Sequence, residues 1–180
     1  MITALAFGNN LLAFNNYVLD PTGVPEPPAG YTRFMWRFDG IGGSDCFQMG
    51  AIRLNDIALP YTYVTYAKGG GRTIAAQLPD KMVAAMSGDD PYHKWCVDRW
   101  SSNIWGWFIF DMPTPIVPTK YELQTAGDTA DYPARNPTRT RLYASHGTPT
   151  TFEDPSWELI VDSSMTLPAA NFRWVTVWEQ

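Results

Sequence analysis

The chain has few of the residues on which catalysis and metal binding usually depend. Its 180 residues include two histidines, His93 and His146. Neither lies near a recognisable nucleophile motif that would suggest a Ser-His-Asp triad, and no His, Glu or Cys spacing fits a zinc site. No motif marks Asp128 and Asp131 as a glycosidase pair. We therefore expect a protein that is not an enzyme.

Cysteine is equally scarce, with Cys46 and Cys96 alone. Two cysteines are too few for a disulfide framework or a metal cluster. Each follows an aromatic-rich segment, which favours buried free thiols. A Cys46–Cys96 disulfide is the alternative, and the sequence does not decide between the two states.

Charge is sparse and unclustered. Lysine and arginine total 13 against 18 acidic residues, and charged residues make up 17% of the chain. Binding of nucleic acid or of an anionic membrane through a basic patch needs a cluster of positive charge, so neither partner is expected. Neutral polar groups must cover much of the surface. This suits recognition of uncharged, hydroxyl-rich ligands, and it suits a subunit of a larger assembly equally well.

Long apolar runs are missing as well. No segment approaches the roughly 18 apolar residues that span a bilayer, so membrane insertion is not expected. Residues 1–20 (Met1–Asp20) are apolar but are broken by Asn pairs and lack a positive n-region, so no signal peptide is expected. Residues 21–30, PTGVPEPPAG, contain four prolines and two glycines and are predicted to form a linker.

Aromatic residues, by contrast, are abundant: they make up 14% of the chain and include eight tryptophans. Aromatic side chains favour strands. In YTRFMWRF, Phe34, Trp36 and Phe38 alternate with Arg and Met, which predicts a strand with one buried face. Residues 81–86 are the only expected helical turn. Further strands are predicted at residues 47–54, 61–66, 105–111, 121–125, 141–144, 157–161 and 172–178.

Many short strands with Gly and Pro turns between them predict an all-β fold, an antiparallel jelly-roll β-sandwich. No heptad, solenoid period or βαβ alternation competes with it. We expect one domain over residues 31–180, preceded by an N-terminal arm and linker over residues 1–30. The side chains expected to point into its core are Phe34, Trp36, Phe38, Trp107, Ile109, Leu123, Leu142, Leu159 and Val175.

Several short motifs follow one another in a particular order. The first are Trp36-Arg37, Gly42-Gly43 and the segment QMGAIRLND at residues 48–56. The later ones are the loop AMSGDDPYHKW, the strand ending at Asp111, the loop with Asp128 and Arg135-Asn136-Pro137, and the strand leading to Ala144-Ser145. This order resembles the discoidin-like family, which comprises coagulation factor V/VIII C-type domains and family 32 carbohydrate-binding modules. The resemblance covers roughly residues 31–180. It implies a galactose-binding-type jelly roll that binds ligands rather than catalysing a reaction.

The resemblance also implies a sugar site at the loop end of the sandwich. Such sites combine an aromatic platform with a few convergent polar groups. Arg99 beside Trp100 is the pair of first interest. The alternative is that Trp100 plugs the end of the barrel while Arg99 pairs with Asp98 or a carbonyl. The candidate ligand-binding residues are Asp45, Tyr92, His93, Arg99, Trp100, Arg135 and Asn136.

Members of this family often hold a structural calcium in the acidic loop, helped by a glutamate on an early strand. Here Ala51 stands where that glutamate is expected. Asp89 and Asp90 still offer the hard oxygen ligands that calcium prefers. Alternatively, the two aspartates cap a turn. No other cofactor is expected.

Two functions fit these observations. The first is a non-enzymatic structural or adhesion subunit of a virion, such as that of a phage, or of another surface assembly. Met1–Asp20 would contact the other subunits, the subunits would form a homo-oligomer, and the domain could also bind cell-surface glycans. An apolar arm that is too short to fold alone favours this function, because a partner would order it. The alternative is a stand-alone carbohydrate-binding module that is accessory to a glycan-active enzyme.

Overall fold

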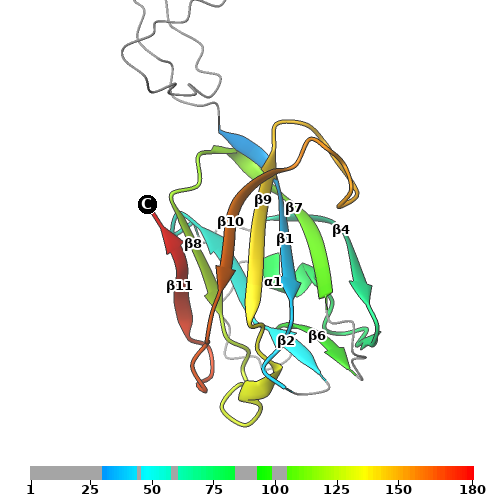
Figure 1. The fold of residues 1–180 in the computed structure, drawn as a ribbon, viewed down its shortest axis with the longest axis vertical. Coiled ribbons are helices and arrows are strands. Elements are labelled where there is room, and N and C mark those ends of the chain that lie inside the picture. The colour runs from blue at the N-terminus through cyan, green and yellow to red at the C-terminus, as the bar shows by residue number, and fades with distance from the viewer. Residues whose placement is uncertain (1–29, 44–45, 58–60, 84–92, 99–104) are drawn as a thin grey trace, which may run out of the picture.

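The computed structural model describes residues 30–43, 46–57, 61–83, 93–98 and 105–180. In this part of the chain, antiparallel strands form three sheets (Figure 1). The predicted all-β class is therefore confirmed. The helical turn expected at residues 81–86 is present as α1 (Asp80–Val83), which begins one residue earlier than predicted.

The largest sheet has the strand order β10-β9-β1-β7-β4. Its central strand, β1, pairs with β7 on one side and with β9 on the other. Both neighbours of β1 thus come from distant parts of the chain. The five strands are β1 (Tyr31–Asp39), β4 (Thr62–Gly69), β7 (Trp105–Ile116), β9 (Arg139–Ser145) and β10 (Glu158–Ser164).

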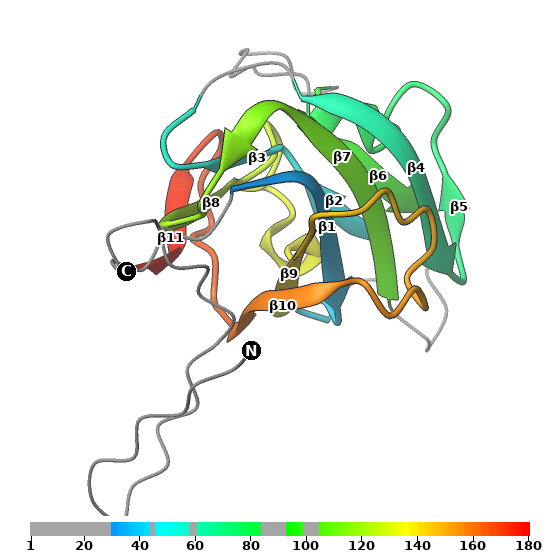
Figure 2. The same ribbon diagram turned by 90° about the horizontal axis from the view of Figure 1, so that it is seen from above.

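Two smaller sheets complete the fold. The first, in the order β11-β8-β3, lies across the core from the large sheet, as Figure 2 shows. Its strands are β3 (Ala51–Leu54), β8 (Lys120–Gln124) and β11 (Trp174–Glu179). The second has the order β2-β6-β5 and contains β2 (Phe47–Met49), β5 (Arg72–Thr73) and β6 (Trp95–Asp98). A 3-10 turn, η1 (Pro133–Arg135), follows β8.

The single strand predicted at residues 47–54 is in fact two strands that belong to different sheets. Gly50 separates them, and its N–H donates to Gln124 O at 2.9 Å. A Cβ at Gly50 would lie 2.7 Å from the carbonyl oxygen of Thr125. Only glycine lets the chain pass this close to the backbone after β8, so the chain changes sheet here.

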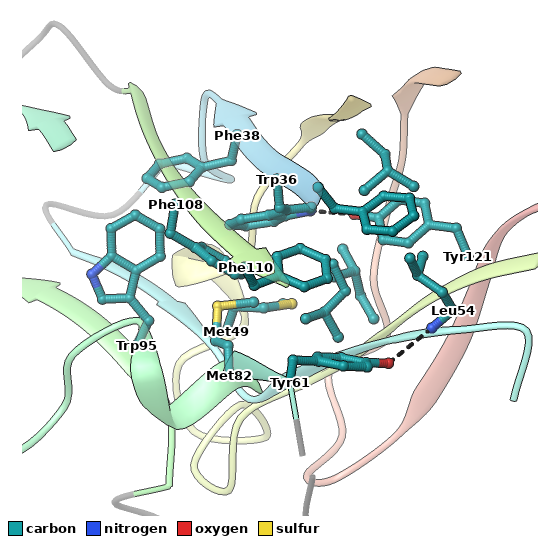
Figure 3. Close-up of a cluster of buried hydrophobic side chains, with 14 of the residues drawn as sticks. Trp36, Phe38, Met49, Leu54, Tyr61, Met82, Trp95, Phe108, Phe110 and Tyr121 are labelled. Atoms are coloured by element: carbon teal, nitrogen blue, oxygen red, sulfur yellow. Dashed lines mark hydrogen bonds between the residues drawn. The ribbon is translucent and has the colours of Figure 1, made fainter. Parts of the chain in front are cut away.

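The main core lies between the sheets and is largely aromatic (Figure 3). Phe34, Trp36 and Phe38 are all fully buried, as their period-2 spacing predicted. The Phe38 and Phe47 rings stack with their centroids 3.8 Å apart. Two polar side chains of the core are hydrogen-bonded to each other. Trp36 Nε1 donates to the Tyr121 hydroxyl, which donates in turn to Thr140 Oγ1 at 3.3 Å. Burial raises the pKa of Tyr121 well above its usual range.

Trp107 and Ile109 are buried, but in a second cluster on the opposite face of the large sheet. Trp36 lies directly opposite Phe108, and Phe34 opposite Phe110. Directly paired residues share a face, so Phe108 and Phe110 occupy the main core instead. Trp107 and Ile109 are thus buried as predicted, but on the other face of the sheet from Phe34 and Trp36. The reason is that the apolar run WGWFIF is buried on both faces, and alternation alone cannot assign the sides.

Leu159 was also expected in the core, and it is 54% exposed. The pairing of β10 with β9 shifts between Leu159 and Val161, which leaves Ile160 as the extra residue of a β-bulge. Because of this shift, Val161 takes the core position with 5% exposure. Leu123 and Leu142 are buried as predicted, whereas Val175 is half-buried against the edge of the core.

Cys46 and Cys96 are buried free thiols, so the structure does not contain the alternative disulfide. Burial raises the pKa of the Cys96 thiol to about 11. Among the described residues, no helix has the length and apolar character needed to cross a membrane.

Candidate functional site

A group of polar side chains, called here the polar cluster, gathers where β2 and β6 meet the turns after β8. Gln48 lies in β2 and Lys94 directly precedes β6. Asp128 belongs to the turn after β8, and Arg135 and Asn136 end η1. Figure 1 shows the yellow segment after β8 next to β2. The members therefore come from three separate parts of the chain.

The loop after β1 fixes the position of η1. Gly42 N donates to Asn136 O at 3.1 Å, and Ile41 forms a β-bridge with Pro137. A Cβ on Gly42 would lie 3.2 Å from the backbone of Ala134, so the glycine allows the two loops to approach closely. The Gly42-Gly43 motif of the sequence thus helps to build the site.

Lys94 is the charged centre of the polar cluster. Its side chain is 5% exposed, and its Nζ lies 2.6 Å from Asp128 Oδ2 and 3.1 Å from Gln48 Oε1. A buried ammonium group needs such partners because it has lost its hydration. Lys94 and Asp128 therefore hold each other, and Gln48, in fixed positions.

Arg135 adds a second positive charge and an aromatic contact. Its Nη1 lies 3.8 Å from the same Asp128 oxygen that Lys94 contacts. Its guanidinium group lies 3.8 Å above the centre of the Tyr132 ring, a cation–π contact. Tyr132 itself is 47% exposed. The guanidinium covers one ring face, so an aromatic surface remains at the edge of the polar cluster.

Four buried polar atoms of the polar cluster have no hydrogen-bond partner in the structure: Asp128 Oδ1, Arg135 Nε and both polar atoms of the Asn136 amide. Asn136 as a whole is 4% exposed. A buried polar atom without a partner costs about 1–3 kcal/mol, and most native proteins satisfy such atoms. The polar cluster therefore retains unused capacity both to donate and to accept hydrogen bonds.

The structure brings together two of the seven predicted ligand-binding residues, Arg135 and Asn136. A third, His93, is half-buried and directly precedes Lys94. The other four, Asp45, Tyr92, Arg99 and Trp100, lie outside the described residues, as do Asp89 and Asp90 of the calcium prediction. Within the described residues, no group of three or more His, Cys, Asp or Glu side chains could hold a metal ion.

Sequence reasoning missed Gln48, Lys94 and Tyr132 as site residues, and it assigned Asp128 only to a motif. One signal for Lys94 was available, because this lysine directly precedes the apolar residues Trp95, Cys96 and Val97. A lysine in such a position is buried only when it is paired.

No family model, curated protein or solved structure matches the chain. The discoidin-like resemblance thus remains an interpretation of the sequence motifs.

Two other groups of charges are complete ion pairs. Arg33 contacts both carboxylate oxygens of Asp111 at 2.7 Å. Glu122 binds Arg53, and it also lies 3.3 Å from Lys120. Their carboxylates are already paired, so we assign these groups a structural role. Within the part of the chain that the structure describes, the polar cluster is the better candidate for a binding site because it combines an exposed aromatic ring with several unsatisfied atoms.

Proposed function

We propose that this protein is a non-enzymatic adhesion or structural subunit of a virion or other surface assembly. In this proposal, the polar cluster binds a neutral, hydroxylated ligand such as a sugar. The observation that carries the proposal is the set of buried polar atoms without a hydrogen-bond partner in the turns after β8: Asp128 Oδ1, Arg135 Nε and both polar atoms of the Asn136 amide.

The chemistry of the polar cluster suits a sugar. Each hydroxyl group both donates and accepts a hydrogen bond, and planar amide, carboxylate and guanidinium groups can pair with neighbouring hydroxyls. These atoms are closed to solvent in the structure, so a small opening of the loops would let a ligand hydroxyl, or a bridging water, supply the missing partners of Asn136 and Asp128. The exposed face of Tyr132 would pack against the apolar face of the sugar ring.

The strand order is compatible with a jelly roll of the discoidin-like type. β1 lies between β7 and β9, two strands from later in the chain, and this arrangement requires long connections of the Greek-key kind. The assembly role depends on the apolar arm at residues 1–20 and places the protein at a virion or extracellular surface. The same site would also serve a stand-alone carbohydrate-binding module accessory to an enzyme. A protein that binds sugar but stays monomeric would favour that second function.

A glycan array probed with the multimeric protein, followed by titration of the best glycan, tests the binding role. A single site of this kind should bind with micromolar to millimolar affinity. Asn136→Ala should weaken binding at least about tenfold while leaving the melting temperature unchanged or higher, because it removes two unsatisfied buried atoms. Asp131→Ala, at an exposed position in the same turn, is the matched control and should bind normally.

Two outcomes would overturn the binding role. One is an array without signal, and the other is an Asn136→Ala variant that binds the glycan as well as the wild type. If Asn136→Ala unfolds instead, the amide has a structural role and the protein is a purely structural subunit. Trp100→Ala tests the part of the predicted site that lies outside the described residues, and it should lose binding while remaining folded.

A further inference from the structure

An apolar hollow of about 380 Å³ lies between the edges of two sheets. Its walls come from the start of β1, the loop after β7, and the strands β10 and β11. The residues that line it are mainly Tyr31, Val117, Pro118, Leu159, Ile160 and Trp178. This hollow is separate from the polar cluster, with which it shares no residue.

Two of the apolar side chains that line the hollow are exposed to solvent. Leu159 is 54% exposed and Val117 is 40% exposed. Successive residues of a regular strand point to opposite faces, yet Leu159 and Ile160 both line the hollow. The β-bulge at Ile160 explains this, because the extra residue turns both side chains to the same side.

Both strands beside the hollow are edge strands. Among the described strands, β10 pairs only with β9, and β11 pairs only with β8. Figure 1 shows β10 and β11 next to each other, each at the edge of its sheet. An edge strand offers backbone N–H and C=O groups to a further strand, and apolar pockets beside it can take alternate side chains.

The chain enters the described fold directly at this hollow. Gly30 is packed so closely that a Cβ there would lie 2.7 Å from the backbone nitrogen of Ile116. Tyr31, the next residue, lines the hollow and is fixed by its hydroxyl, which donates to Glu158 Oε2 at 2.9 Å. The linker at residues 21–30 therefore starts at the hollow, and the apolar residues 1–20 precede it.

The composition of the linker indicates whether the arm docks in the hollow of its own chain or in that of a neighbouring molecule. A proline-rich segment extends about 3.1 Å per residue, so ten such residues cover about 30 Å. This is about twice the radius of gyration of a domain of this size, which is about 15 Å. An arm meant for the hollow beside Tyr31 of its own chain would need no such spacer. A proline-rich spacer of this length instead favours docking on a neighbouring molecule.

We propose that residues 1–20 of one copy dock in the hollow between β10 and β11 of a second copy, where they add a strand to an open sheet edge. Apolar residues of the arm, such as Leu11, Leu12 and Phe14, fill the hollow. Reciprocal exchange gives a closed dimer, and one-way exchange gives longer assemblies. The inference rests on the assembly part of the proposed function and is independent of the sugar site.

Light scattering on the full-length chain over a range of concentrations tests the interface. Leu159→Asp and the double variant Leu11→Asp with Leu12→Asp should each raise the association midpoint at least about tenfold, since each puts charge into an apolar contact. Ile74→Asp is the matched control, because Ile74 is 36% exposed and does not line the hollow. It should associate like the wild type. Circular dichroism should show that Leu159→Asp is folded, as its exposure predicts.

Photo-crosslinking identifies the occupant of the hollow. Chains labelled with ¹⁵N that carry benzoylphenylalanine at position 159 are mixed with unlabelled chains and irradiated. Mass spectrometry should find heavy position 159 joined to light residues 1–20. If crosslinks form only within one chain, the proposal is overturned, because the arm then docks in the hollow of its own chain. An oligomer without crosslinks to residues 1–20 would overturn the docking site but not the assembly role. A monomer at every concentration would overturn both, and neither result would affect glycan binding.

Discussion

Glu122 shows how this protein accommodates a buried charge. The residue is 4% exposed in β8, and its carboxylate binds Arg53 from the neighbouring strand β3. Lys120 Nζ and Thr176 Oγ1 lie 3.3 and 3.2 Å from Glu122 Oε1. Burial raises the pKa of this carboxyl group, whereas the hydrogen bonds and positive charges of Arg53 and Lys120 lower it. The lowering is the larger effect, so the pKa lies below its usual value. The ion pairs thus outweigh the cost of burial.

We predict that Glu122→Gln destabilises the fold in a pH-dependent manner. The folded pKa is below the unfolded value of about 4.3, so the stabilising contribution is complete above that pH and is lost as the pH falls through the folded pKa. The variant should be about 1–3 kcal/mol less stable than the wild type at pH 7, and the difference should shrink by pH 3. Urea unfolding at both pH values measures this.

Glu179→Gln is the control for this experiment, because Glu179 is an exposed residue at the end of β11. It should change the free energy of unfolding by less than about 0.5 kcal/mol. If Glu122→Gln lowers the free energy of unfolding by the same amount at pH 7 and pH 3, Glu122 stabilises the fold through its packing and not through its charge.

At the scale of the element, β1 and β7 show what alternation can predict. In β1 the apolar residues alternate with Arg33 and Arg37, so the sequence identifies the core face. In β7 all residues from Trp107 to Phe110 are apolar, and only the pairing with β1 distinguishes the two faces. The β10 bulge is equally invisible in the sequence, because it depends on register against β9. Alternation thus could not assign the faces of a strand that is buried on both sides, and it misplaced Leu159, whose strand has an irregular register with its partner.

The pairing of β1 with β7 also makes Gly106 essential. Gly106 lies opposite Phe38, and a Cβ there would be 2.7 Å from the Phe38 ring and 2.8 Å from the Trp95 ring. Both rings are fully buried and cannot move aside. We predict that Gly106→Ala costs about 1–3 kcal/mol of stability through overpacking, measured by chemical denaturation.

Gly147→Ala is the matched control, since the nearest atom to its added Cβ would be Ser145 Oγ at 3.5 Å, an ordinary contact. It should be neutral within about 0.5 kcal/mol. Equal stabilities of the two variants would mean that the Phe38 and Trp95 rings can repack.

At the scale of the whole molecule, the polar cluster shows the limit of local motifs. Arg135 and Asn136 were predicted because they lie in a loop that the family resemblance places at the ligand-binding end of the sandwich. Gln48, Lys94 and Asp128 are separated by 46 and 34 residues, and their contacts depend on how β2, β6 and the turn after β8 come together. The spacing of these three residues in the sequence does not predict their contacts, because the contacts depend on the sheet topology and not on a sequence repeat. Local motifs therefore identified Arg135 and Asn136 but not Gln48 or Lys94.

The two apolar clusters share one sheet, which bears on how the molecule unfolds. The main core contains side chains from all three sheets, and the outer cluster packs on β1 and β7 of the large sheet. Strands far apart in the chain must pair before either cluster closes, as Tyr31 and Ile116 illustrate. Neither cluster can therefore form without the other's central strands.

We accordingly predict a single cooperative unfolding transition. Far-UV circular dichroism and tryptophan fluorescence should give the same denaturation midpoint, since Trp36 and Trp95 report on the main core and Trp107 and Trp157 on the outer cluster. The measurement should use the Leu159→Asp variant. Because association between its chains is weakened, unfolding can be measured without dissociation of the oligomer. A Trp157→Phe variant lacks one of the two tryptophans that report on the outer cluster, and its two denaturation midpoints should still agree. A fluorescence change well before the loss of the sheet signal would instead mean that the outer layer opens first, and that the large sheet stays folded without the segment that carries Phe152 and Trp157.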